Sequence, residues 1–303
     1  MNYSYRFQLK RLLWKLLQRR RVLILGDGRS GTTWLSELIN FDNRYIDCFE
    51  PLHGRRIVKL RDRLYPTKDD LTLTEFQRTI AANLNLRRTI DSRRVPKGVL
   101  VKEITAHLIA DYAYQSNFNI ILLIRNPLAV AHSKSLYGYW HTDADLERLT
   151  MDSSFSEIHK KCMESSLTTS RFLEYVEIWC LLYRWAFRNL KVRGNTTTVI
   201  FYENLMTDRE TQIERIFTRI NETELFNAHK DLIINKSATP SAKTTDDSTQ
   251  QAGARAEKYW LANRSSEEID QAYEIVRLYG LYDIYNDEFA PRQTATSLEK
   301  RLA

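Results

Sequence analysis

Several features that define whole classes of proteins are missing from this chain of 303 residues. No apolar run approaches the roughly 20 residues that a membrane-spanning helix needs, and no repeat or low-complexity tract is present. The three cysteines, Cys48, Cys162 and Cys180, are odd in number and widely spaced, so they indicate neither a metal site nor a disulfide framework. With no signal peptide visible, we expect a reduced, cytoplasmic setting. What is present is a globular composition, with 43% apolar and 27% charged residues.

The positive charge of the chain is concentrated in one segment. Residues 1–21 hold seven basic residues and no acidic ones, which accounts for the whole net charge of +7. This concentration argues against an extended nucleic-acid-binding surface, and we expect no nucleic-acid partner. Five leucines recur in this segment at helical spacing: Leu9, Leu12, Leu13, Leu16 and Leu17. We favour a helix that packs on the domain with a solvated basic face, and keep peripheral contact with an anionic membrane as the alternative. The chain thus divides into a basic amphipathic helix, residues 1–21, and a single domain, residues 22–303.

The stretch LILGDGRSGTTWLSELIN, residues 23–40, combines the parts of a phosphate-binding loop. It begins with an apolar run typical of a buried strand, continues with three glycines within six residues, and ends in an amphipathic segment with helical spacing. Backbone N–H groups converge at such a turn, and the dipole of the following helix adds about half a positive charge.

The loop departs from the motif of nucleotide-triphosphate-binding proteins. Thr32 stands where G-x-x-x-x-G-K-[ST] requires lysine, and the nearest cation is Arg29. A second buried strand is predicted at residues 119–124, and it ends in Arg125 instead of the aspartate that would bind Mg²⁺. Both differences count against a nucleotide kinase or NTPase, which we keep as an alternative together with a non-catalytic binder of anionic surfaces. No pattern of metal ligands is present, and we expect no metal.

The run GRSGTTWL, residues 28–35, closely resembles the 5′-phosphosulfate loop of the sulfotransferases, whose donor is 3′-phosphoadenosine-5′-phosphosulfate (PAPS). The resemblance implies an α/β fold of P-loop-like, three-layer α/β/α type with a mainly parallel central sheet. It implies transfer of a sulfuryl group from PAPS to an acceptor hydroxyl by in-line displacement. The donor-binding residues that it implies in this loop are Gly28, Arg29, Ser30, Gly31, Thr32, Thr33 and Trp34, with Trp34 stacking on the adenine.

Arg125-Asn126-Pro127, followed six residues later by Ser133, is similar to the family's 3′-phosphate motif. An arginine gives a forked, charge-assisted grip on a phosphate, and the serine hydroxyl adds a donor. PAPS differs from ATP in carrying a 3′-phosphate, so the two motifs together make the resemblance specific. Three further donor contacts are implied: Tyr202 near the adenine, and Ser241 and Lys243 in a loop that lacks the family's R-K-G signature.

Glu50 is the predicted catalytic base. It follows a predicted strand, residues 44–49, and Pro51 ends that strand, so Glu50 is expected at the carboxyl edge of the sheet beside the phosphate loop. The run FEPL resembles the Golgi-type carbohydrate sulfotransferases, which implies a carbohydrate acceptor; lipids, peptide tyrosines and small molecules stay open. His53 is the alternative base.

Lys102 ends a predicted strand, residues 99–102, and with Arg29 it is the cation expected near the reacting groups. Cytosolic sulfotransferases place a catalytic histidine two residues after this lysine. This chain has Ile104 there, and His107 lies further on. The departure favours Glu50 over a histidine.

Overall fold

The computed structural model of the protein describes residues 3–17, 20–54, 57, 60, 63–86, 95–136, 141–190, 197–241, 264–286 and 289–302. Within them, five parallel strands form one sheet in the order β2-β3-β1-β4-β5. The strands are β1 (Arg21–Leu25), β2 (Tyr45–Phe49), β3 (Gly98–Glu103), β4 (Phe118–Ile124) and β5 (Thr197–Phe201). This arrangement confirms the predicted α/β class with a parallel central sheet.

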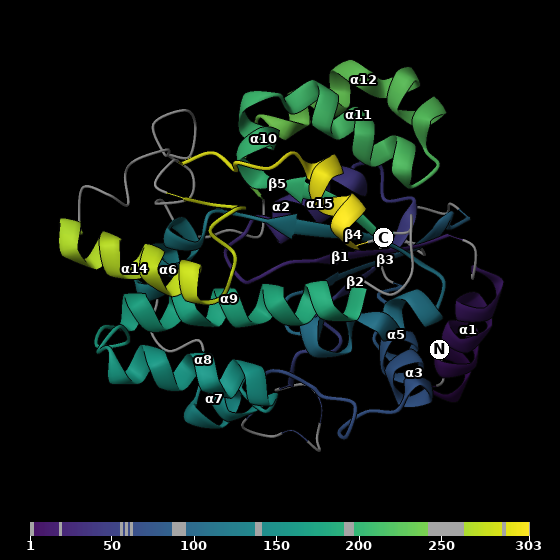
Figure 1. Ribbon diagram of the computed structural model, residues 1–303. Helices are drawn as coiled ribbons and strands as arrows, with labels where there is room; N and C mark the ends of the chain where they lie inside the picture. The colour runs from purple at the N-terminus through teal and green to yellow at the C-terminus, as the bar shows by residue number, and fades with distance from the viewer. Residues whose placement is uncertain are drawn as a thin grey trace.

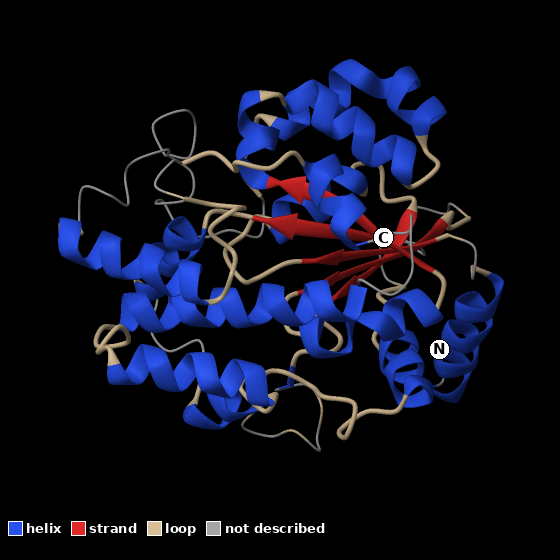
Figure 2. Ribbon diagram, in the orientation of Figure 1, coloured by secondary structure: helices blue, strands red, loops and turns tan. Residues whose placement is uncertain are grey.

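Helices cover both faces of the sheet (Figure 2). Successive residues of a strand point to opposite faces, and both sets are apolar, so each face needs a layer of helices. Val22 and Ile24 of β1 lie in the core beneath α2 (Thr32–Ile39), α10 (Tyr202–Thr207), α11 (Arg209–Arg219) and α12 (Thr223–Ser237). Leu23 and Leu25 lie in the opposite core, over which α9 (Arg171–Leu190) runs (Figure 1).

The second face also carries most of the shorter helices. They are α3 (Leu73–Ala82), α5 (Ala110–Gln115), α6 (Pro127–Ser135), α7 (Asp143–Leu149), α8 (Ser153–Glu164), α14 (Ser266–Leu278) and a 3₁₀ turn, η2 (Ala106–Ile109). The last described helix, α15 (Ala295–Leu302), packs beside β5. Within the described residues, no helix is both long and apolar enough to span a membrane.

The N-terminal helix α1 (Tyr3–Leu16) packs on the domain through Trp14, which is buried against Phe118 of β4. Arg21 donates to the carbonyl oxygens of Trp14 and Ser116, its guanidinium lies 3.5 Å from the Trp14 ring centroid, and burial lowers its pKa to about 10. The leucine stripe predicted for this segment is wrong in part. Leu12 and Leu16 are 53% and 69% exposed, because the contact made by Trp14 turns them outward. Contact of this segment with an anionic membrane stays a prediction, as does the boundary at residue 22.

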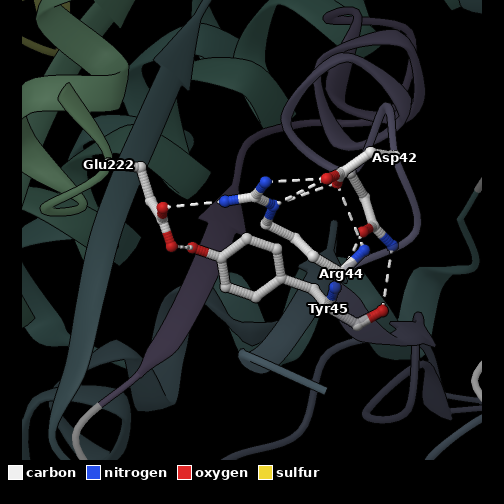
Figure 3. Close-up of polar contacts among 5 residues, drawn as sticks. Asp42, Arg44, Tyr45 and Glu222 are labelled. Atoms are coloured by element: carbon white, nitrogen blue, oxygen red, sulfur yellow. Dashed lines mark hydrogen bonds and ion pairs between the residues drawn. The ribbon is translucent and has the colours of Figure 1, made fainter. Parts of the chain in front are cut away.

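A polar cluster anchors the start of β2 to α12 (Figure 3). Arg44 lies between two carboxylates, with Nη2 2.7 Å from Asp42 Oδ2 and Nη1 3.0 Å from Glu222 Oε2. The hydroxyl of Tyr45 donates to the other oxygen of Glu222. The cluster lies where β2 begins, at the edge of the sheet opposite the carboxyl ends of the strands.

The outer edge of β5 is covered by two side chains. Glu299 of α15 accepts the Val199 N–H at 2.7 Å, and Arg215 of α11 donates to the Val199 carbonyl oxygen at the same distance. Arg215 and Glu299 also form an ion pair. These contacts occupy backbone groups that an edge strand otherwise presents to another chain.

A buried carboxylate, Glu177 of α9, joins three helices. Its Oε1 lies 3.0 Å from Nδ1 of His159 in α8 and accepts the hydroxyl of Tyr279, at the end of α14. The hydrogen bond to Glu177 and its negative charge raise the pKa of His159 above its ordinary value.

We expect this contact to stabilise the protein at acid pH and not at alkaline pH. Because the pKa of His159 is raised in the folded state, its contribution is complete below about pH 6.5, the ordinary value, and is lost as the pH rises through the folded-state value. The difference in melting temperature between the wild type and His159→Gln should therefore shrink as the pH rises from 5.5 to 8.5. Lys161→Gln, an exposed change in the same helix, is the control. A difference that does not depend on pH contradicts the prediction.

Candidate active site

The phosphate loop joins β1 to α2 and is pressed against β4 and Tyr202. A Cβ atom on Gly26 would lie 2.6 Å from the carbonyl oxygen of Leu123, and one on Gly31 would lie 2.8 Å from the Tyr202 ring. Gly31 also has a φ of +90° and Arg29 a φ of +69°, in the left-handed region. The glycines therefore allow a close approach of the loop that side chains would prevent.

The structure brings the loop into direct contact with the predicted 3′-phosphate motif. Arg29 Nε donates to Ser133 Oγ at 2.9 Å, and Arg125 Nη1 donates to the Arg29 carbonyl oxygen at 2.8 Å. The guanidinium of Arg125 lies 4.5 Å from the ring centroid of Tyr202. Four residues predicted from separate motifs thus form one cluster.

A second set of contacts fixes the turn that carries Arg125. Asn126 caps α6, since its side chain accepts the N–H groups of Leu128 and Ala129. Its own N–H donates to Glu203 Oε1 at 2.8 Å, and the hydroxyl of Tyr285 donates to Oε2 of the same carboxylate. Burial raises the pKa of Glu203. Arg125 therefore projects from a turn held by a buried, hydrogen-bonded carboxylate.

Glu50 and Lys102 form an ion pair at the tips of β2 and β3, between Glu50 Oε1 and Lys102 Nζ. The Glu50 N–H donates to the Lys102 carbonyl oxygen at 2.7 Å, so both backbone and side chain hold the two residues together. Glu50 has a φ of +48°, an unfavourable value for a residue with a side chain. Their side chains are 15% and 4% exposed, respectively. The structure thus places both predicted residues at the carboxyl edge of the sheet, paired with each other.

A buried carboxylate also supports this part of the site. Glu103 accepts the N–H groups of Leu52 and Ile104 at 2.8 Å and the hydroxyl of Thr105 at 3.0 Å. Burial raises its pKa. By accepting the Leu52 N–H, Glu103 fixes the turn that contains Glu50.

The remaining predicted residues have more varied positions. Trp34 and Thr33 are half-buried on α2, and Ser241 is buried. The N–H of His53 donates to the Glu50 carbonyl oxygen at 3.4 Å, so His53 follows Glu50 in the same turn. Lys243 lies outside the described residues. The catalytic and donor-binding roles of all these residues stay predictions.

His107 is unsuited to act as a base. It is fully buried in η2, and burial, helped by the nearby charge of Lys134, lowers its pKa to about 3. It is thus neutral at physiological pH and is shielded from solvent.

Sequence reasoning missed a buried ion pair behind the loop. Lys134 of α6 contacts both carboxylate oxygens of Asp27 at 2.6 and 2.7 Å, and each side chain is 2% exposed. Burial raises the pKa of Asp27, and the charge of Lys134 opposes this effect. One signal was available: a carboxylate within an anion-binding loop is unfavourable unless a cation neutralises it. No comparable feature of the sequence points to Glu103 or Tyr285.

The comparisons with known proteins identify the family of this chain. The sequence profile of the sulfotransferase domain family matches residues 19–264. The chain belongs to the sulfotransferase family. It is therefore an enzyme of the sulfotransferase class, as predicted. A search of curated proteins found no match.

A search of solved structures found similarity to other sulfotransferases. Mouse sulfotransferase SULT7A1 complexed with PAP is 13% identical, with a TM-score of 0.51, and the match covers 96% of this chain and 94% of that chain. The sulfotransferase domain from the curacin biosynthetic pathway is 14% identical, with a TM-score of 0.40 and coverage of 93% and 95%. A sulfotransferase from Alicyclobacillus acidocaldarius is 12% identical, with a TM-score of 0.39 and coverage of 86% and 96%. The first of these supports the assigned fold.

The contact between Gly31 and Tyr202 leads to a prediction. Gly31→Ala should weaken binding of 3′-phosphoadenosine-5′-phosphate (PAP) by about tenfold or more, because the added methyl group displaces the loop or the Tyr202 ring. Isothermal titration calorimetry measures the effect.

Gly280→Ala is the matched control. Gly280 also has a positive φ, of +66°, but the nearest atom to an added Cβ, Arg184 Nη1, is 3.9 Å away. This variant should lose about 1 kcal/mol of stability from backbone strain and bind PAP normally. Equal losses of binding in the two variants would show that a general loss of stability, and not the Tyr202 contact, is responsible.

Proposed function

We propose that this sulfotransferase transfers the sulfuryl group of PAPS to an acceptor hydroxyl, with Glu50 as the base. The observation that carries the proposal is the contact between the loop and the 3′-phosphate motif through Arg29 and Ser133. A donor with phosphate groups at both ends of its ribose would engage both motifs at once. The mouse sulfotransferase of similar fold was solved with PAP, which agrees with this choice of donor.

The donor side of the site supplies positive charge. The loop N–H groups and the start of α2 favour the 5′-phosphosulfate. Arg125 and Ser133 are the proposed ligands of the 3′-phosphate. Tyr202 already holds the guanidinium of Arg125 against its ring, and this contact positions the arginine.

The chemistry proceeds by in-line displacement. The acceptor oxygen forms a bond to sulfur while the bond from sulfur to the bridging phosphate oxygen breaks. The hydroxyl proton passes to the Glu50 carboxylate, and the bridging oxygen leaves with a negative charge on PAP. Arg29 and the loop N–H groups stabilise that charge, and Lys102 holds Glu50 in place through their ion pair.

We propose a carbohydrate as the acceptor, because the Phe49-Glu50-Pro51-Leu52 turn resembles that of the Golgi-type enzymes. Incubation of the protein with labelled PAPS and separate pools of glycans, lipids, peptides and small phenols tests this proposal. Label found only outside the glycan pool would contradict it.

The choice of donor is tested by comparing PAP with ATP–Mg²⁺ in calorimetry. We expect PAP to bind at least about a hundredfold more tightly, which corresponds to about 2.7 kcal/mol from the 3′-phosphate contacts. Ser133→Ala should reduce this preference. Equal or tighter binding of ATP–Mg²⁺ would support a nucleotide kinase or NTPase instead.

Substitution of Glu50 separates catalysis from donor binding. In Glu50→Gln, sulfate transfer should fall by about 10²- to 10⁴-fold, the usual contribution of a general base, while the affinity for PAP stays unchanged. The measurement follows transfer from labelled PAPS to an accepted substrate. His53→Gln is the matched control and should retain transfer. The reverse pattern would make His53 the base.

A further inference from the structure

The buried pair of Asp27 and Lys134 connects the two phosphate-binding motifs. Asp27 immediately precedes Gly28 and Arg29 of the loop, and Lys134 immediately follows Ser133 in α6. The Asp27 carboxylate accepts the Gly28 N–H as well as binding Lys134 Nζ through both oxygens. The Asp27 side chain therefore fixes the backbone of the phosphate loop and links it to α6, the helix that carries Ser133 of the 3′-phosphate motif.

The surroundings of the pair exclude contact with solvent. Each side chain is 2% exposed, and the ring of Tyr175 lies 5.7 Å from Lys134 Nζ. Behind the loop, the Tyr183 hydroxyl accepts the Asp27 N–H at 3.3 Å and donates to the carbonyl oxygen of Leu123. Because both side chains are buried, neither can contact the donor from this position. The pair therefore acts on the loop from behind.

A buried ion pair is a poor source of stability, because removing two charges from water costs about as much as their attraction returns. Such a pair is better suited to fixing a geometry. Here the geometry is the spacing between the groups that bind the 5′ and 3′ ends of one ligand. The charge of Lys134 also cancels that of Asp27, which would otherwise repel a phosphate.

We propose that Asp27 and Lys134 are positioning residues. They fix the distance between the loop predicted to bind the 5′-phosphosulfate and the motif predicted to bind the 3′-phosphate, and so give the site its preference for a doubly phosphorylated adenosine. The proposal rests on the proposed function. A ligand that contacts both motifs depends on their spacing, whereas a ligand that contacts only the loop does not. Loss of the pair should therefore weaken PAP more than adenosine 5′-phosphate.

The double variant Asp27→Asn/Lys134→Met tests this proposal. It removes both charges together, so the net charge near the loop stays the same and no buried charge is left unpaired. We expect the ratio of the dissociation constants of adenosine 5′-phosphate and PAP to fall by about tenfold, within the usual range of coupling between sites. Calorimetry and competition binding give the two constants.

The matched control breaks an ion pair at the opposite end of the sheet. Arg44→Met/Glu222→Gln removes a contact of the cluster in Figure 3 and should lower the melting temperature without changing the ratio. Each single variant of the Asp27–Lys134 pair leaves one buried charge unpaired and should reduce the ratio at least as much as the double variant.

Two results would overturn the proposal. If the double variant binds both ligands with the same fractional loss, the pair only maintains the fold. If the double variant binds PAP as the wild type does, the spacing of the two phosphate-binding segments does not depend on the pair. Failure of the wild type itself to bind PAP is a different result, since it would refute the proposed donor and not the role of the pair.

Discussion

The site depends on the parallel pairing of β1 with a neighbour on each side. Leu25, the last residue of β1, pairs with Glu103 of β3 and with Leu122 of β4. The loop that follows Leu25 thus leaves the sheet between the tips of two strands that come much later in the sequence. Parallel strands end at a common edge, and ligands of such sheets bind there. The Glu50–Lys102 pair on one side and Arg125 on the other are placed beside the loop by this topology.

Three turns at that edge are each held by a buried carboxylate. Asp27 accepts the Gly28 N–H, Glu103 accepts that of Leu52, and Glu203 accepts that of Asn126. Burial raises the pKa of all three carboxyl groups. Hydrogen bonds, the ion pair with Lys134 and the charge of Arg125 near Glu203 oppose this effect. The backbone of these turns is therefore fixed by buried contacts within the protein itself. If the turns bind a donor as proposed, such preorganisation favours binding and catalysis.

Local patterns predicted much of this protein, and contacts distant in sequence account for what they missed. The loop follows from its glycines, and the strands predicted at 44–49, 99–102 and 119–124 follow from apolar runs. These limits differ by one residue at one or both ends from the observed strands, Tyr45–Phe49, Gly98–Glu103 and Phe118–Ile124. Lys134 was not predicted, because a lysine in a helix reads as a solvent-exposed residue until its partner is known. Leu12 and Leu16 were predicted to lie on the buried stripe of α1 but are exposed. The helix is oriented by the contacts of Trp14 with Phe118 and Arg21, which belong to strands and not to the leucine pattern. The turn that carries Arg125 is held by Glu203, which lies just after β5, through the Asn126 N–H. No local pattern in the sequence connects these residues.

The covered edge of β5 has a consequence for the order of events during synthesis. The backbone of Val199 is satisfied by Arg215, 16 residues further along the chain, and by Glu299, 100 residues further along. While the ribosome makes the intervening residues, the sheet can assemble but its outer strand still presents open hydrogen-bonding groups. Nascent chains are vulnerable to aggregation at such edges. The strand ends that carry the predicted site residues of this sulfotransferase are thus encoded well before α15, whose Glu299 covers the edge of β5.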